Sequence, residues 1–196
     1  GMLGWLSVEQ IRDGRPTTFG AASGVVAGLV AITPACGTVN TLGAGIVGLA
    51  AGVVCSFAVS LKFRWNYDDS LDVVGVHYVG GFVGVLLIGL LATPTMTGGP
   101  SGLFFGGGFA QLGKQFVGVV VVALYAFGVT YGLGKLIDKT FGFRISREDE
   151  ARGIDVALHA ESAYEHGVLG HGPIGGQNPS PFLQRQREER ENRERD

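Results

Sequence analysis

The stretch VVGVHYVGGFVGVLLIGLLA, residues 73–92, decides the fold because it contains no Asp, Glu, Lys or Arg. At a rise of 1.5 Å per residue, about 20 helical residues cross the hydrocarbon core of a bilayer, which is roughly 30 Å thick. The stretch is therefore predicted to be a transmembrane helix.

His77 is the ionisable residue of this stretch. A full charge at the centre of a membrane helix costs about 2.5–3.5 kcal/mol on insertion scales, so the imidazole is expected to be neutral and to face protein or a water-filled path. This position makes His77 the main functional candidate. The alternative is a packing role, in which His77 forms a hydrogen bond with a neighbouring helix.

The composition is that of a membrane protein. The chain has 196 residues, of which 46% are hydrophobic and 16% are charged, and its mean hydropathy is +0.30. A soluble domain carries about 25% charged residues. Cys36 and Cys55 lie in apolar surroundings without paired spacing, so neither a disulfide nor a metal pair is predicted.

Further apolar runs predict an all-α polytopic membrane protein with four transmembrane helices. The predicted spans are 19–34, 39–61, 73–92 and 112–137, preceded by the end of a helix at 2–11. Together they form a predicted transmembrane domain at 1–144, in contact with membrane lipid. A polar region at 145–165 and a polar tail at 166–196, predicted to be disordered, complete the chain.

The charges predict the orientation. Basic residues fall on alternate connections, and the two connections between them carry none. The positive-inside rule then places the basic connections and the C-terminus in the cytoplasm. The basic residues are Arg12, Arg15, Lys62, Arg64, Lys135, Lys139 and Arg144.

Glycines recur four residues apart within the predicted spans. Such pairs put two glycines on one helix face and favour close contact between helices. The four pairs are Gly24 with Gly28, Gly48 with Gly52, Gly80 with Gly84, and Gly128 with Gly132.

Other motifs carry less weight. Residues 108–114 imitate a phosphate-binding loop, but Gln115 stands where a Ser or Thr would hold magnesium. His159, His166 and His171 lie in a polar region without regular metal-ligand spacing. No catalytic triad or carboxylate pair falls at membrane depth, so an enzyme is not expected. A cofactor, a metal site and a nucleic-acid partner are not expected either.

Three stretches carry a resemblance to a known family. DDSLDVVGVHYVGG at 68–81 resembles the DVFGVHGVGG signature of the ammonium transporter (Amt/Mep/Rh) family. Residues 14–37 and 153–164 resemble two further family regions, and the match runs from residue 2 to about residue 164. The resemblance implies ammonium or ammonia transport across the cell membrane by a homotrimer whose eleven-helix subunits each enclose a pore.

The resemblance also implies roles for single residues. His77 would be the second of two histidines that line the pore, with Val73 facing the same lumen and Thr33 beside the path. The cytoplasmic loop acids would meet the C-terminal region, which helps to bind the PII signalling protein in this family. These residues are Asp68, Asp69 and Asp72 in the loop, and Gly153, Asp155, His159, Glu161 and Tyr164 in the C-terminal region.

The chain departs from the family pattern in several ways. It would supply the end of the seventh helix and helices eight to eleven, so the first pore histidine and the outer recruitment site are missing. Tyr78 and Ala160 replace glycines that are usual in the family. Two functions follow. The first is ammonium transport as part of a larger or split subunit. The second is a non-conducting scaffold or nitrogen sensor that retains PII-docking surfaces, or a decayed remnant without transport.

Overall fold

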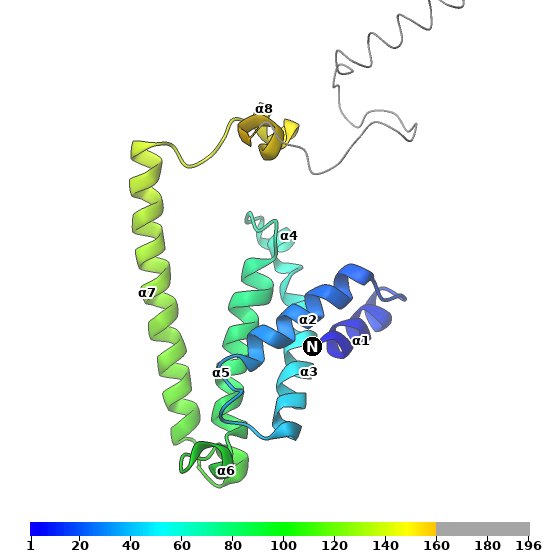
Figure 1. Cartoon of the computed structure of the whole chain (residues 1–196), viewed down its shortest axis with the longest axis vertical. Coiled ribbons are helices and arrows are strands. Elements are labelled where there is room, and N and C mark those ends of the chain that lie inside the picture. The colour runs from blue at the N-terminus through cyan, green and yellow to red at the C-terminus, as the bar shows by residue number, and fades with distance from the viewer. Residues whose placement is uncertain (160–196) are drawn as a thin grey trace, which may run out of the picture. The chain divides into compact units, whose positions relative to one another are not determined.

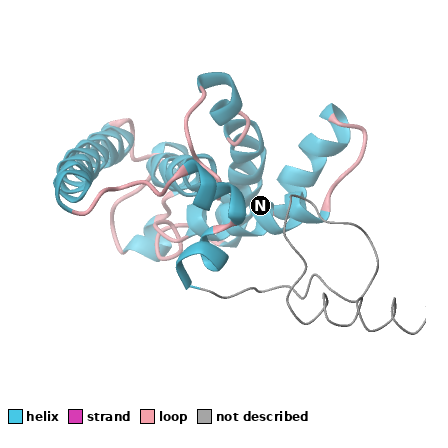
Figure 2. Cartoon of the chain, turned by 90° about the horizontal axis from the view of Figure 1, so that it is seen from above, coloured by secondary structure: helices cyan, strands magenta, loops and turns pink. Residues whose placement is uncertain are grey.

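A computed structural model describes residues 1–159, and these residues form helices joined by turns, with no strand among them (Figures 1 and 2). The predicted all-α membrane fold is confirmed. The α-helices are α1 Met2–Arg12, α2 Thr18–Ile32, α3 Thr41–Ala58, α4 Leu61–Trp65, α5 Val79–Leu91, α6 Pro94–Thr97, α7 Ala110–Thr140 and α8 Arg147–Arg152. Two π-helices, η1 Val73–Tyr78 and η3 Asp155–His159, and a 3₁₀ turn, η2 Leu103–Phe105, complete the set.

Three helical segments are long and apolar enough to cross a membrane: Thr41–Trp65, Val73–Leu91 and Ala110–Thr140. The predicted span at 19–34 corresponds to α2, which has 15 residues and is therefore roughly 22 Å long. The stretch predicted as one span at 39–61 contains a break after Ala58. There the Ser60 hydroxyl donates a 2.6 Å hydrogen bond to the Phe57 carbonyl, a local bond that competes with continuation of the helix.

Side chains define where the first two apolar helices begin. The Thr17 hydroxyl accepts a hydrogen bond from the Gly20 N–H at 2.8 Å, and the Asn40 side chain accepts one from the Gly43 N–H at 2.9 Å. Each bond satisfies a backbone donor that has no partner within its own helix. Thr17 and Asn40 thus begin α2 and α3.

Helices α1, α2, α3 and α5 pack together through small residues. A Cβ on Gly24 would collide with Trp5, one on Gly52 with Gly1, and one on Gly84 with the Ala31 backbone. The close approach predicted from glycine spacing is therefore confirmed for three pairs. For Gly128 and Gly132, whose Cβ positions have no neighbour within 4 Å in the described residues, it stays a prediction.

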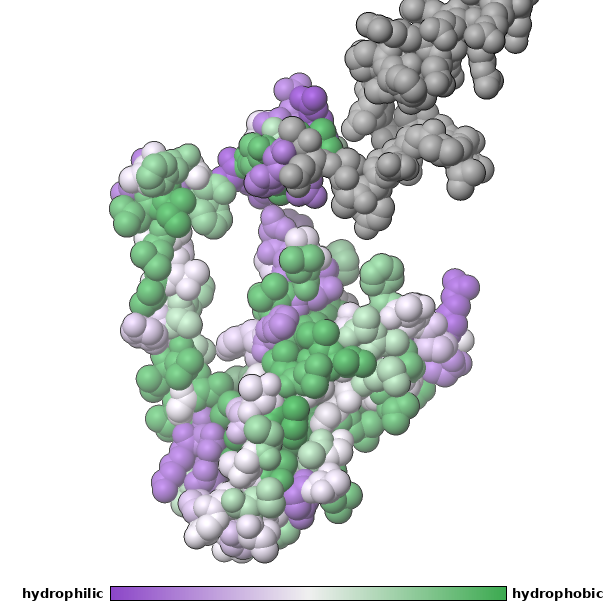
Figure 3. Space-filling view, viewed as in Figure 1, coloured by the Kyte–Doolittle hydropathy of each residue, from purple (hydrophilic) through white to green (hydrophobic). Residues whose placement is uncertain are grey.

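Helix α7 has no buried residue in the described part of the chain. Its side chains are apolar for most of its length, and Figure 3 shows hydrophobic residues over much of the visible surface. An apolar outer surface is expected where lipid or other apolar protein, rather than water, surrounds a helix.

The chain divides into two compact units, Gly1–Leu136 and Ile137–Asp196. This division falls within α7, whereas the sequence predicted a domain boundary at residue 144 from the change in composition. In the second unit, the Ser146 hydroxyl caps α8 by accepting from the Asp149 N–H at 3.1 Å. The predicted tail at 166–196 lies outside the described residues.

Candidate functional site around the π-helix of His77

His77 lies in η1, the π-helix that begins the span Val73–Leu91. The wide turn is marked by the Val79 N–H, which bonds to the Val74 carbonyl five residues earlier. π-Turns inside α-helices are rare and frequently occur at functional sites. The hydropathy of the stretch did not predict this π-turn, because a change in hydrogen-bonding register leaves the amino-acid composition unchanged.

His77 and Val73 lie four residues apart on this turn, and both are exposed in the described chain. The Val73 side chain is 52% exposed. His77 forms no hydrogen bond or ion pair within the described residues. The exposed side chains of the turn therefore include this imidazole and Val73, together with Val74 and Tyr78.

The Asp69 side chain caps the first turn of the π-helix. Its carboxylate accepts hydrogen bonds from the backbone N–H groups of Val73 and Val74 at 2.8 and 2.9 Å. These two donors belong to the first turn and have no partner earlier in the helix. A carboxylate also suits the positive end of the helix dipole.

Lys62 joins the loop acids to each other. Its ammonium group donates to Asp72 Oδ1 at 2.7 Å and to the Asp69 carbonyl at 3.0 Å. The Lys62 and Asp72 side chains are 16% and 31% exposed, so water screens this pair less than a surface pair. Asp72 adopts a left-handed conformation with φ of 56°, which turns the chain into the π-helix.

The inner side of η1 packs on α3. A Cβ on Gly75 would lie 2.8 Å from the Val59 Cα, so only glycine allows this contact. The buried Cys55 thiol donates to the Val76 carbonyl at 3.8 Å. Cys55, which the sequence suggested was a small buried hydrophobe, thus also satisfies a backbone acceptor in the π-turn.

Thr33, predicted to lie beside the path, is the exposed C-cap of α2. Its hydroxyl donates to the Leu29 carbonyl at 2.7 Å. No hydrogen bond among the described residues joins Thr33 to His77. The structure therefore brings Val73 and His77 onto one turn and joins Asp69 to Asp72 through Lys62, while Thr33 belongs to another helix.

The C-terminal candidates lie in the second unit. Gly153 ends α8 with φ of 94°, and Asp155 and His159 lie in η3. Glu161 and Tyr164 lie outside the described residues. The predicted contact between this region and the loop acids stays a prediction. Among the described residues no group of three His, Cys, Asp or Glu side chains is placed to hold a metal ion.

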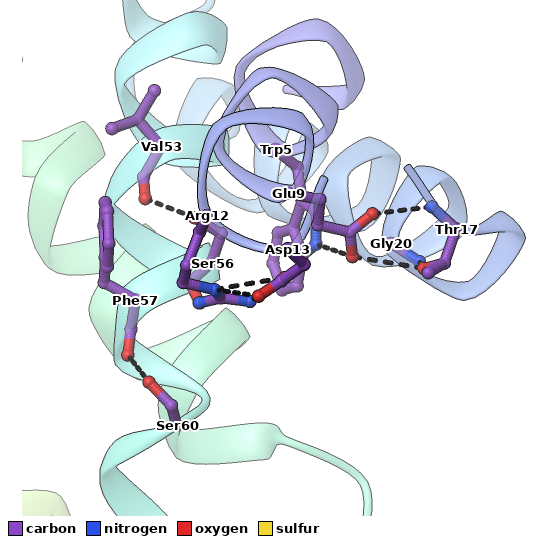
Figure 4. A network of polar contacts seen from close by, with 10 residues as sticks. All are labelled: Trp5, Glu9, Arg12, Asp13, Thr17, Gly20, Val53, Ser56, Phe57 and Ser60. Atoms are coloured by element: carbon purple, nitrogen blue, oxygen red, sulfur yellow. Dashed lines mark hydrogen bonds and ion pairs between the residues drawn. The ribbon is translucent and has the colours of Figure 1, made fainter. Parts of the chain in front are cut away.

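A second polar cluster was not predicted from the sequence (Figure 4). Glu9 is only 7% exposed. Its carboxylate accepts from Trp5 Nε1 at 3.0 Å and from the N–H and hydroxyl of Thr17 at 2.7 and 3.1 Å. The signal that could have revealed it is the spacing of Trp5 and Glu9, which puts an indole donor one helical turn from a carboxylate.

Arg12 extends this cluster to α3. Its guanidinium donates to the Asp13 carboxylate at 2.7 Å and to the Ser56 carbonyl at 3.3 Å. The cluster therefore joins α1, the turn after it, α2 and α3 in one network.

The chain resembles known membrane transporters along most of its length. The model of the Ammonium Transporter Family matches residues 1–164. An ammonium transporter of Mycobacterium tuberculosis is 56% identical over 173 residues, which cover 85% of this chain and 36% of the relative. One of Corynebacterium glutamicum is 43% identical over 183 residues, 93% of this chain and 40% of the relative.

Solved structures show the same fold. Saccharomyces cerevisiae Mep2 matches with a TM-score of 0.70 at 32% identity, covering 76% of this chain and 35% of Mep2. A protein described as Sensor Amt Protein matches with a TM-score of 0.70 at 26% identity, covering 80% of this chain and 38% of that one. The chain thus spans well under half the length of the relatives that it matches.

Proposed function

The chain belongs to the ammonium transporter family, and we propose that it supplies the helices that carry pore residue His77 in an ammonium or ammonia transporter of the cell membrane. Because it spans 36–40% of the curated relatives cited above, it acts as part of a larger or split subunit. The observation that carries the proposal is the exposed imidazole on a membrane-spanning helix of this family, without a partner in the described residues.

The chemistry of a neutral imidazole suits this substrate. A dry pore strongly disfavours the charge of ammonium, whereas ammonia is neutral and both donates and accepts hydrogen bonds. Neutral imidazole has one donor and one acceptor nitrogen, so it can hold ammonia or relay a proton separated from it. Potassium has no proton to lose and is rejected. Val73 supplies an apolar wall beside His77, and Thr33 lies along the path.

The packing alternative for His77 requires a hydrogen-bond partner on a neighbouring helix. Helices α2 and α3 both contact η1, yet neither offers His77 a hydrogen bond. This supports a role toward the pore over a role in packing.

The remaining proposals concern assembly and regulation. The complete subunit forms a homotrimer with the C-terminus in the cytoplasm. Its loop acids Asp68, Asp69 and Asp72 meet the region of Gly153 to Tyr164, and this surface binds a PII protein.

A second candidate function is a non-conducting scaffold or nitrogen sensor. The resemblance to a protein described as Sensor Amt Protein favours it. The two functions differ in whether substrate crosses the membrane, so they are separated by transport measurements on the native polypeptide.

The test is His77→Ala in the complete subunit, expressed in cells that lack other ammonium transporters. We expect ammonium uptake to fall and selectivity for ammonium over potassium to decrease. Val74→Ala, a change at a neighbouring exposed residue of the same π-helix, is the control and should leave both unchanged. Unchanged uptake and selectivity in His77→Ala would contradict the pore role.

Sizing the polypeptide in native membranes separates the two functions further. An antibody against residues 184–196 should detect a band well above 20.5 kDa, the mass of this chain, or a partner polypeptide that copurifies with it. A lone 20.5 kDa band without ammonium uptake would favour the scaffold or sensor.

A further inference from the structure

The side chains around η1 fall into two groups. His77 and Val73 lie on its exposed side, while Asp69, Asp72 and Lys62 surround its first turn. The distance along the axis from Val73 to His77 is only about 6 Å at the rise of a helix. A change in how the first turn begins therefore reaches the imidazole within one turn.

We propose that Lys62, Asp69 and Asp72 are positioning residues that hold this turn in its π geometry and thereby set the direction in which the His77 side chain points. The expected effect on transport rests on the proposed function. The effect on the orientation of the His77 side chain does not depend on that function. None of the three residues contacts His77 by a hydrogen bond or ion pair, so they act through the backbone.

Asp69 determines where the helix begins. Its two carboxylate oxygens each accept from one of two successive N–H groups, Val73 and Val74. A shift of the helix by one residue would break this pairing. The bidentate contact therefore selects one register, in which Asp72 takes the left-handed conformation that precedes the wide turn.

Lys62 holds Asp69 and Asp72 in the positions that this register requires. Its ammonium bonds to the Asp69 carbonyl and to the Asp72 carboxylate, and its side chain is only 16% exposed. Charge-assisted hydrogen bonds in such partly buried places are stronger than those between exposed groups. Loss of the ammonium would release Asp69 and Asp72 at once.

The inner side of η1 supplies the opposing contact. Gly75 lies against Val59, and the Cys55 thiol bonds to the Val76 carbonyl. These contacts hold the inner side of the turn against α3, so a change in register at Asp69 cannot shift the whole turn and instead changes its width next to His77. The π-turn relaxes toward an α-helix, and the imidazole turns about the helix axis.

The test measures the reactivity of His77 without relying on transport. The complete subunit in native membranes is treated with diethylpyrocarbonate, a small neutral reagent for imidazole, and modification of His77 and His171 is followed by peptide mass spectrometry. His171 lies in the polar tail, beyond the region proposed to meet the loop acids, and serves as the internal reference. The variants are Lys62→Met and the nearly isosteric Asp69→Asn, with Arg64→Met as the matched cation control on the same short helix.

We expect Lys62→Met and Asp69→Asn to change the His77/His171 modification ratio by roughly three- to tenfold, as loss of one charge-assisted hydrogen bond predicts. Lys62→Arg should restore the ratio, because it keeps a cationic donor, and Arg64→Met should not change it. An unchanged ratio in both variants overturns the proposal, and so does the absence of His77 modification in the unaltered subunit and all its variants. An effect of Arg64→Met equal to that of Lys62→Met also overturns it.

Uptake measured on the same variants separates this proposal from the proposed function. If the modification ratio changes while His77→Ala leaves uptake unaffected, the positioning role stands and the pore role fails. If His77→Ala abolishes uptake while the ratio stays constant, the pore role stands and the positioning role fails. The amount of each variant in the membrane shows that it has folded.

Discussion

Two carboxylates each order the start of a helix, and they differ in burial. Glu9 is 7% exposed and accepts three hydrogen bonds, from the side chain of its own helix α1 and from Thr17 before α2. Asp69 is half-buried and accepts two, both from the backbone of η1. A carboxylate that accepts hydrogen bonds therefore joins two helices, α1 and α2, at Glu9, and sets the register of one helix, η1, at Asp69.

The difference follows from which N–H donors would lose their acceptor if each carboxylate were removed. Without Glu9, the buried Trp5 indole N–H would lose its acceptor away from water, which is costly, and the Thr17 N–H would lose its acceptor as well. Without Asp69, the Val73 and Val74 N–H groups could still bond to water. We expect the Glu9 cluster to contribute to stability, and the Asp69 cluster to local geometry.

The largest effect is expected for Glu9→Ala. Loss of three hydrogen bonds to a buried carboxylate should lower the free energy of unfolding by about 3–5 kcal/mol. Asp69→Ala should lower it by only about 1 kcal/mol, as loss of a helix cap does. Denaturant titration of the detergent-solubilised protein measures both. Equal losses would remove the distinction between the two clusters.

A smaller effect is expected when the Glu9 cluster is displaced rather than deleted. A Cβ on Gly20 would collide with the Glu9 carboxylate, whereas one on Gly81 would lie 4.0 Å from its nearest neighbour, a methyl group of Val30. Gly20→Ala should therefore cost about 2 kcal/mol through overpacking. Gly81→Ala, the control in α5, should be neutral or slightly stabilising, because alanine favours helix. The same titration tests the pair, and a neutral Gly20→Ala would show that Glu9 can move freely.

The smallest effect is expected at the exposed edge of the Glu9 cluster. The hydrogen bond from Arg12 lowers the pKa of Asp13 below its ordinary value of 3.8, and the charge of Arg12 acts in the same direction. Because the pKa is lower in the folded protein, this pair stabilises it above pH 3.8 and ceases to do so as the pH falls through the lower folded value.

Asp13→Asn should remove this acid-dependent part of the stability and leave the neutral-pH value nearly unchanged, since exposed pairs contribute little. Melting temperatures of the two proteins measured between neutral and acidic pH provide the comparison. A large loss at neutral pH would mean that Arg12 depends on Asp13 for its bond to the Ser56 carbonyl.

The sequence predicted the helices well because hydropathy reports burial in lipid directly. The uncharged run at 73–92 is a helix from Val73 to Leu91 in the structure, and the glycines at 80 and 84 approach α3 and α2 as their spacing suggested. At Gly128 and Gly132 the same spacing meets no neighbour in the described residues. A glycine pair shows that a helix face can be approached closely, but not that a partner is present.

The candidate site was predicted only in part. His77 and Val73 could be singled out by position, since ionisable residues in apolar spans are rare. The π-turn could not, because it depends on the pairing of Asp69 with two N–H groups and on the Lys62 bridge across the loop. Glu9 was missed for a related reason: a single acid near a helix end resembles a surface residue until the Trp5 indole is seen to cover it.

The wide turn at the start of the His77 helix also has a consequence for insertions and deletions. A π-turn holds one residue more than the α-helical turn it replaces. Loss of one codon within residues 73–76 would close the turn and leave a span of about 18 residues, roughly 27 Å long, which still nearly crosses the bilayer. The same deletion between Gly80 and Gly84 would turn one glycine about 100° away from its partner helix. A one-residue deletion at the beginning of this span should therefore disturb the packing of its glycine face less than one in its middle.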